Sequence, residues 1–374
     1  MSLEGTGLMR ISRVKSFPVS LPLKKPAYVP GLTITSRDYH ITVVETDSGV
    51  DGVGFTLRRG AEMTRLIDDL LAPALIGEDP RYTEALWDRL YQKTMHAGQR
   101  GLLMRALSTV DIALWDIKAK ELGEPLFRLL GGYRDRVPVL LVAGYYEEGK
   151  GPDQLALEMQ RYAAQNFRLL KFVAGALTAE EDRARIRAVR EAVGPDVMLM
   201  VDIDWGWRRV KDAVAAVRLW EPYRLEWVEE PFPPENLPAR VEFRRLSPVK
   251  VALGDEQSGL GLFRDLLENR AVDVLRPDTV VLGGITPTVK VWALAAAWDL
   301  PVSPHLFPEI NVHLVAAYPQ GFAVEMFAKD TELYKLDELQ VRPLSPETGM
   351  LEVPQTPGLG IEFDWKAVEA ARIG

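Results

Sequence analysis

Apolar runs of strand length recur at an even spacing along the chain, and several of them end on a charged residue or a histidine. The runs VMLMVD, LEWVE, VALGD and PVSPH end at Asp202, Glu229, Asp255 and His305. The first three of these residues lie 27 and 26 residues apart, and His305 follows 50 residues later. Helix-like segments lie between most of the runs, which indicates successive β-α units.

Eight strands are expected in this part of the chain, at residues 137–144, 169–173, 197–202, 225–229, 249–254, 272–276, 302–305 and 322–326. Two of the helices between them have recognisable starts. One is a capping box at residues 178–181, and the other is a Gly-Gly turn that makes Thr286 an N-cap. The rhythm predicts a closed β/α barrel, in which side chains at the C-terminal strand ends converge on one mouth.

The first 125 residues do not follow this rhythm. Strands are expected at residues 11–21, 38–46 and 50–56, and helices at residues 62–76, 81–95 and 102–122. An antiparallel sheet with a helical bundle indicates an α+β domain. We therefore expect this domain at residues 1–125 and the barrel at residues 126–328. The last segment, residues 329–374, is irregular and is expected to return to the first domain.

Composition narrows the class of protein. The 374 residues are 47% hydrophobic and 26% charged, and a net charge of -8 gives a nucleic-acid partner no electrostatic support. No apolar run is long enough to span a bilayer and no signal peptide is visible, so we expect no membrane partner and a cytoplasmic location. The chain contains no cysteine, which excludes disulfides, thiolate zinc sites and cysteine nucleophiles.

Three carboxylates at one barrel mouth predict a metal site. Asp202, Glu229 and Asp255 would repel one another unless a cation lay between them. Oxygen ligands without Cys or His favour a hard ion, Mg²⁺ before Mn²⁺. The alternative is that the carboxylates are merely solvated. Each also has an acidic neighbour, namely Asp204, Glu230 or Glu256. Because adjacent strand residues point to opposite faces, only one of each adjacent pair should reach the ion.

His305 and Asp278 end neighbouring predicted strands. An aspartate that accepts a hydrogen bond from one imidazole nitrogen fixes the tautomer and raises the basicity of the other nitrogen. This pair predicts a general base, although a histidine beside a proline can also be purely structural. His313 is expected to be structural.

Two charged residues interrupt apolar strands. Lys171 either has a lowered pKa as a base, binds a substrate carboxylate, or extends its amine to solvent as a surface lysine. Glu325 is either a protonated hydrogen-bond donor to developing negative charge or one half of a buried ion pair.

Five segments carry a more specific pattern, namely GLLMRALSTVDIALWDIK at 101–118, WVEEP at 227–231, VLRPD at 274–278, GGIT at 283–286 and SPHLFPEI at 303–310. In this order, over nearly the whole chain, they resemble the enolase superfamily, and within it the mandelate racemase subgroup of the mandelate racemase/muconate lactonizing enzyme family. The resemblance implies an α+β capping domain over a modified (β/α)₇β TIM barrel. It also implies enolate chemistry with magnesium and a Lys or His base, and a homo-oligomer.

The resemblance also assigns roles to single residues. The ligands of one Mg²⁺ per subunit fall on Asp202, Glu229 and Asp255. The catalytic dyad and the electrophilic acid fall on His305, Asp278 and Glu325. Many subgroup members have Glu at the third ligand position, and a gapless count back from Asp278 selects Asp255 rather than Glu256 here.

One departure from the family pattern bears on the reaction. Many members carry Lys-x-Lys at the end of the second barrel strand, whereas this chain has Lys171-Phe172-Val173. A racemase needs a base on each face of the α-carbon, and His305 is the one clear base here. We therefore expect dehydration of a sugar acid or related hydroxy acid to a 2-keto-3-deoxy acid. The alternatives are a racemase or epimerase of a hydroxy or amino acid and a non-catalytic metal- or ligand-binding barrel.

The substrate is expected to be a small carboxylate, with specificity supplied by the capping domain. Besides Lys171, the candidates for its binding are Lys24, Lys25 and Tyr28, in an expected loop at residues 23–35, and Arg58 and Arg59, in the region of residues 57–60. These charges are equally compatible with a solvated surface.

Overall fold

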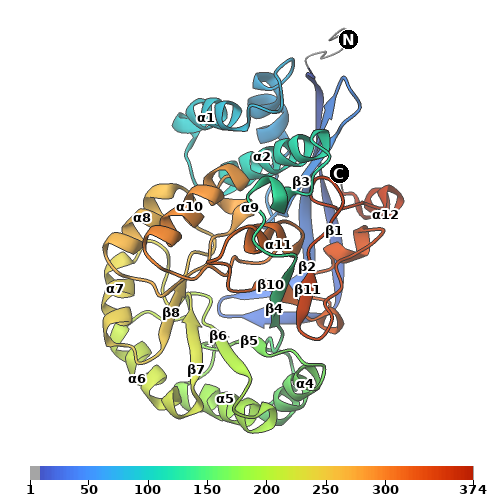
Figure 1. The fold of residues 1–374 in the computed structure, drawn as a ribbon. Coiled ribbons are helices and arrows are strands. Elements are labelled where there is room, and N and C mark those ends of the chain that lie inside the picture. The colour runs from blue at the N-terminus through green and yellow to red at the C-terminus, as the bar shows by residue number, and fades with distance from the viewer. Residues whose placement is uncertain (1–8, 374) are drawn as a thin grey trace.

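The computed structural model describes residues 9–373, and its N-terminal part is built on a three-stranded antiparallel sheet (Figure 1). The strands are β1 (Ile11–Val29), β2 (Leu32–Thr46) and β3 (Gly52–Leu57), in the order β1-β2-β3. The prediction of a loop at residues 23–35 is wrong, because this segment is part of two strands. It continues β1 and β2 as a long hairpin that turns at Gly31, with a register shift between Pro22 and Ala27. The Tyr28 amide donates to the Tyr146 carbonyl, which ties the hairpin to the barrel.

Helices cover one face of this sheet. The long α2 (Leu102–Glu121) packs on the sheet, and α1 (Thr83–Thr94) packs on α2, both close to the predicted bounds. The helix expected at residues 62–76 is instead a π-helix (Leu66–Leu71) and a 3₁₀ turn (Ala72–Ala74), because Pro73 supplies no backbone N–H. A Cβ on Gly54 would lie 1.9 Å from the Thr109 carbonyl oxygen, so glycine lets α2 pack directly on β3.

The second part is a barrel of parallel strands surrounded by helices (Figure 1). Its strands are β4 (Arg136–Val142), β5 (Leu169–Val173), β6 (Met198–Asp202), β7 (Leu225–Glu229), β8 (Lys250–Leu253), β9 (Val274–Leu275) and β10 (Val324–Phe327). The order is β10-β4-β5-β6-β7-β8-β9. The strand expected at residues 302–305 is reduced to bridges from Val302 to Leu275 and Gly321, since Pro301 and Pro304 cannot donate to a ladder. These bridges complete the ring between β9 and β10.

Helices lie outside the barrel, one of them before β4 and the others after successive strands. They are α3 (Leu126–Leu129), α4 (Pro152–Ala164), α5 (Ala179–Val193), α6 (Val210–Trp220), α7 (Leu237–Leu246), α8 (Leu260–Glu268), α9 (Thr279–Leu282), α10 (Ile285–Ala297) and α11 (Pro308–Ala317). The capping box at Thr178 is present. The prediction that Thr286 is an N-cap is wrong, because Gly284 occupies that position. The amide and hydroxyl of Thr286 instead donate to Asp111 of α2, which joins the two parts of the molecule.

The C-terminal segment contacts both parts. β11 (Met350–Glu352) pairs antiparallel with β4, and α12 (Trp365–Ala371) lies beside β1, where Arg372 bridges to Val19. The domain boundaries at residues 125 and 328 stay predictions.

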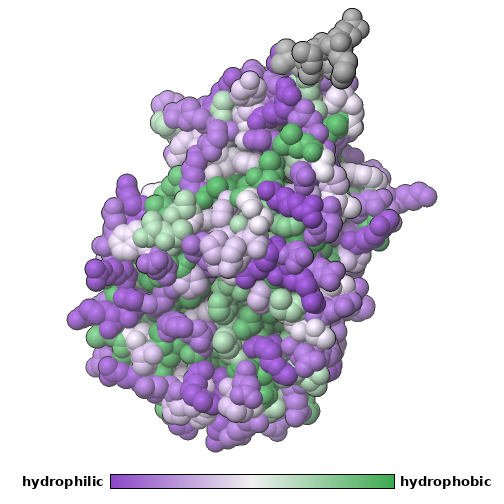
Figure 2. All heavy atoms as spheres, in the orientation of Figure 1, coloured by the Kyte–Doolittle hydropathy of each residue, from purple (hydrophilic) through white to green (hydrophobic). Residues whose placement is uncertain are grey.

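The core follows this division. One large apolar cluster lies between the barrel strands and their helices, and a second joins the N-terminal sheet to α11 and the C-terminal segment. On the face that Figure 2 shows, hydrophilic residues predominate and hydrophobic residues appear in patches between them. Among residues 9–373, no helix combines the length and apolarity that a bilayer crossing requires.

Candidate functional site

Three carboxylates meet at the C-terminal ends of neighbouring barrel strands. Asp202 ends β6, Glu229 ends β7 and Asp255 follows β8. One carboxylate oxygen from each lies within 4.8 Å of the others. Glu229 and Asp255 are buried, and Asp202 is partly exposed toward the barrel mouth. Parallel strands place their ends on one rim, and period-2 alternation turns these side chains inward.

The acidic neighbours of two of these residues have other partners. Glu230 accepts from Arg240 at 2.5 Å and from the amides of Gly254 and Asp255 at 2.5 and 3.0 Å, so it holds the backbone that carries Asp255. Glu256 pairs with two arginines from the N-terminal part. Both residues have positive φ values, 41° for Glu230 and 55° for Glu256, which turn them away from the cluster.

Two cations lie against the three carboxylates inside the barrel. Lys171 Nζ lies 2.5 Å from Glu229 Oε1, 2.9 Å from Glu325 Oε2 and 3.3 Å from Asp202 Oδ2. Arg276 Nε lies 3.1 Å from Glu229 Oε2 and 3.7 Å from Asp255 Oδ1, and its Nη2 also pairs with Glu325. Both cations are buried.

This network decides between the alternatives for Lys171 and Glu325. Burial and Arg276 favour the neutral amine of Lys171, but Glu229, Glu325 and Asp202 hold its pKa above the usual range. A lowered pKa for Lys171 is therefore wrong. Burial opposes ionisation of Glu325, yet Arg276 and Lys171 lower its pKa to about 2. Glu325 is thus an ionised partner in a buried ion pair, and not a protonated donor, in this arrangement.

The cluster has the features of a cation site. Burial raises the pKa of Glu229 and raises that of Asp255 well above its usual value, because a carboxylate removed from water is costly to ionise. Asp255 Oδ1 is buried and finds no hydrogen-bond partner among the described residues. An orphaned carboxylate oxygen beside two further carboxylates fits a hard divalent ion. The donor set therefore fits magnesium.

His305 stands beside the same cluster. Its Nδ1 lies 2.8 Å from Asp278 Oδ2, and its Nε2 lies 3.7 Å from Asp255 Oδ2. Burial favours the neutral ring, but Asp255 and Asp278 raise the pKa of His305 to about 10. His313 is different, because Phe127 N–H donates to its Nδ1 and its Nε2 faces the Leu359 carbonyl.

A small cavity lies above the carboxylates. Asp202, Asp255 and His305 contribute to it from the barrel, and Val173 lines it from the end of β5. The capping sheet contributes apolar residues from the hairpin, namely Val29, Leu32 and Ile34. Its volume of about 60 Å³ is the share of roughly two water molecules in the liquid. The cavity is therefore small, and the end of the hairpin forms part of its wall.

Most candidate substrate-binding residues of the cap lie elsewhere. Lys25 borders a separate surface cavity, Tyr28 is not among the residues that line the small cavity, and Arg58 binds the Ala61 carbonyl and Glu62. Arg37 and Arg59 line the small cavity instead. Arg59 was one of the sequence candidates, whereas Arg37 and Arg276 were missed, although Arg276 lies two residues before Asp278 inside the VLRPD segment.

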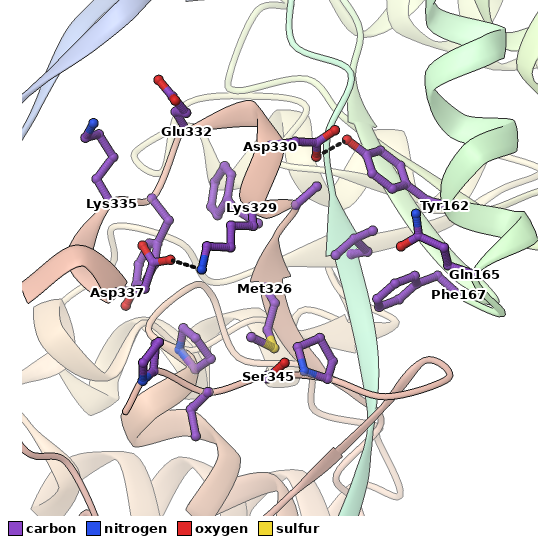
Figure 3. Close-up of a pocket in the computed structure, with 18 of the residues that line it drawn as sticks. Tyr162, Gln165, Phe167, Met326, Lys329, Asp330, Glu332, Lys335, Asp337 and Ser345 are labelled. Atoms are coloured by element: carbon purple, nitrogen blue, oxygen red, sulfur yellow. Dashed lines mark hydrogen bonds and ion pairs between the residues drawn. The ribbon is translucent and has the colours of Figure 1, made fainter. Parts of the chain in front are cut away.

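A larger cavity, of about 640 Å³, lies on the outer side of β10 (Figure 3). Residues of α4, β10 and the C-terminal segment line it, with Tyr162 hydrogen-bonded to Asp330 at 2.7 Å and Lys329 3.9 Å from Asp337. None of the three clustered carboxylates borders it. The small cavity is therefore the candidate active site.

Comparison with known families and relatives agrees with this geometry. Residues 11–131 match "Mandelate racemase / muconate lactonizing enzyme, N-terminal domain", and residues 154–367 match "Enolase C-terminal domain-like". The arabinonate dehydratase of Saccharolobus solfataricus is 31% identical over 339 residues, which cover 89% of this chain and 90% of the relative. The D-galactarolactone cycloisomerase of Agrobacterium fabrum is 31% identical, with 98% of this chain and 99% of the relative covered.

A solved structure is also similar over its whole length. It is the L-talarate dehydratase of Polaromonas sp. JS666 complexed with Mg and L-glucarate, with a TM-score of 0.87, 32% identity and 98% of each chain covered. The predicted family and the predicted capped barrel are confirmed by these matches. The chain belongs to the mandelate racemase/muconate lactonizing enzyme family of the enolase superfamily.

Proposed function

We propose that this protein is a magnesium-dependent dehydratase that converts a sugar acid into a 2-keto-3-deoxy acid. The observation that carries this proposal is the asymmetry of the cavity walls. His305 and its partner Asp278 stand on one side, and Val173 is the residue at the end of β5. One base suffices for removal of water, whereas exchange of configuration at the α-carbon needs a group on each face. Dehydratases among the relatives support the same reaction class.

The proton transfers are assigned to His305. Nδ1–H donates to Asp278, which fixes the ring so that Nε2 faces the cavity. Nε2 takes the proton α to the carboxylate, and the imidazolium then returns it to the hydroxyl that leaves the β-carbon. One proton and one hydroxide leave as water, and the resulting enol becomes the 2-keto-3-deoxy acid.

Asp202, Glu229 and Asp255 are the proposed ligands of one Mg²⁺ per chain. When bound, this ion would neutralise charge on the enediolate oxygens and offset the charge of Asp255 that now keeps His305 protonated. The two buried cations have a supporting part. Lys171, held positive by its carboxylate neighbours, is suited to bind the substrate carboxylate and not to act as a base.

Glu325 and Arg276 hold Lys171 and Glu229 in place through the ion pairs described above. Glu325 would therefore act on the reaction through Lys171. Like its relatives, the chain is proposed to act on a small carboxylate. We also propose that it forms a homo-oligomer.

A turnover screen tests the proposal. The purified protein with Mg²⁺ is incubated with a panel of sugar acids in deuterated water, and loss of acid, 2-keto acid and α-deuterium are followed together. We expect 2-keto acid formation, and its loss in the His305→Asn and Asp202→Asn variants. Exchange of the α-proton without elimination would instead identify a racemase or epimerase. Binding of acids without any turnover would identify a non-catalytic barrel.

A further inference from the structure

One buried cation in the roof of the candidate active site has no counterion. Arg37 of β2 lines the small cavity and is 6% exposed. Its Nε donates to the Leu333 carbonyl, and its guanidinium lies 5.6 Å from the centroid of the Phe327 ring. None of the ion pairs among residues 9–373 includes Arg37. The two Nη groups make no hydrogen bond to the described residues, so most of the donors of this guanidinium are unused.

The other arginine that lines the cavity, Arg59, already has a carboxylate partner. Arg59 pairs with Glu256, which also binds Arg105, so a carboxylate already neutralises part of the charge at that corner. Glu256 Oε1 receives the Arg59 Nε–H at 3.1 Å. Arg37 is therefore the cation of the cavity that remains available to an incoming anion.

A largely buried guanidinium without a carboxylate partner is left for water to satisfy, and an anionic ligand would satisfy it better. A carbonyl and an aromatic face compensate a cation only in part. The planar guanidinium offers two parallel N–H groups that match the two oxygens of a carboxylate. The position is also suitable, because the triad and His305 lie on the barrel side of the cavity and Arg37 lies on the capping sheet.

We infer that Arg37 binds a second carboxylate, at the end of the substrate remote from the acidic triad, and that the protein selects dicarboxylic sugar acids over their monocarboxylic counterparts. The inference deepens the proposed function and rests on it. A terminal phosphate would offer the same negative charge. A carboxylate fits better because a single guanidinium fork in a small cavity matches two oxygens in one plane.

Matched pairs of acids test the inference. Galactarate and glucarate are compared with galactonate and gluconate, and 6-phosphogluconate supplies the phosphate. We expect the wild-type protein to have a kcat/KM at least about tenfold higher for the dicarboxylates, the lower end of what one charged hydrogen-bond pair supplies. Arg37→Met should lower kcat/KM for the dicarboxylates roughly 10- to 100-fold, mainly through KM, and change that for the monocarboxylates less than about threefold. Arg13 is an exposed arginine of the same sheet, so Arg13→Met is the matched control. It should leave kcat/KM unchanged for both classes of acid.

Binding measurements separate this inference from the proposed reaction. The dissociation constant of galactarate is measured with magnesium-loaded His305→Asn protein, with and without Arg37→Met, and we expect the second substitution to weaken binding roughly 10- to 100-fold. Tight, Arg37-dependent binding without turnover by the wild-type protein would contradict the dehydratase and leave the anion site standing. An equal loss for both classes of acid, or preference for 6-phosphogluconate, would overturn the dicarboxylate site alone. If Arg37→Met does not fold, the wild-type protein alone decides: equal kcat/KM for dicarboxylic and monocarboxylic sugar acids would overturn the dicarboxylate site.

Discussion

His313 should make the stability of this protein depend on pH between neutrality and about pH 4.5. The ring is fully buried in α11, where Phe127 N–H donates to Nδ1 at 3.3 Å and Nε2 faces the Leu359 carbonyl at 3.0 Å. These partners accept only the neutral tautomer with hydrogen on Nε2, because a second hydrogen on Nδ1 would meet the Phe127 N–H. Burial lowers the pKa of His313 to about 4 from its ordinary value of 6.5.

The sign follows from the two pKa values. As pH falls below 6.5, the unfolded chain binds a proton that the folded protein refuses, so stability is lost until the pH approaches 4. With about 1.4 kcal/mol for each unit of pKa difference, the loss near pH 4.5 is about 2–3 kcal/mol. His313 therefore costs no stability well above pH 6.5, where the ring is neutral in both states. Below the folded pKa of about 4 the ring is protonated in both states, and the stability no longer changes with pH on its account.

Urea unfolding of the wild-type protein and of His313→Gln, at several pH values, measures this contribution. Glutamine keeps one donor and one acceptor but does not titrate. The wild-type protein should lose about 2–3 kcal/mol relative to the variant between about pH 7.5 and pH 4.5. His40, whose pKa is also lowered to about 4 by burial, is present in both proteins and cancels in the difference. Two stability curves that stay parallel over this range would refute the reasoning.

Three further predictions concern the site. Val173→Lys should add a second base, so that α-deuterium exchange occurs on both faces of the substrate. NMR would detect this as a loss of stereospecific labelling, and unchanged labelling would contradict the one-base explanation. Glu230→Gln should destabilise the protein by about 3–5 kcal/mol in urea unfolding, because Arg240 loses its buried partner, and a change below about 1 kcal/mol would be inconsistent with this. Magnesium should raise the thermal midpoint of the wild-type protein and of the surface control Asp265→Asn, but not of Asp255→Asn.

Much of the site could be predicted from the sequence because strands have a simple period. The apolar runs that end at Asp202 and Glu229 became β6 and β7 with the expected ends. Alternation along a strand also limited each pair of adjacent carboxylates to one inward member. The seventh barrel strand, expected at residues 302–305, was predicted too long, since the prolines there leave only the bridges at Val302.

The sequence by itself determined the order of β-α units, the family and the residues that converge at the barrel mouth. Only the tertiary structure decided what each charged side chain faces. The left-handed backbone at Glu230 and Glu256, the ion pairs of Arg276 and the hairpin that carries the cavity residues all depend on chain segments far apart in sequence. Electrostatic partners are chosen by distance in space, and no local pattern of hydrophobic and polar positions records that distance.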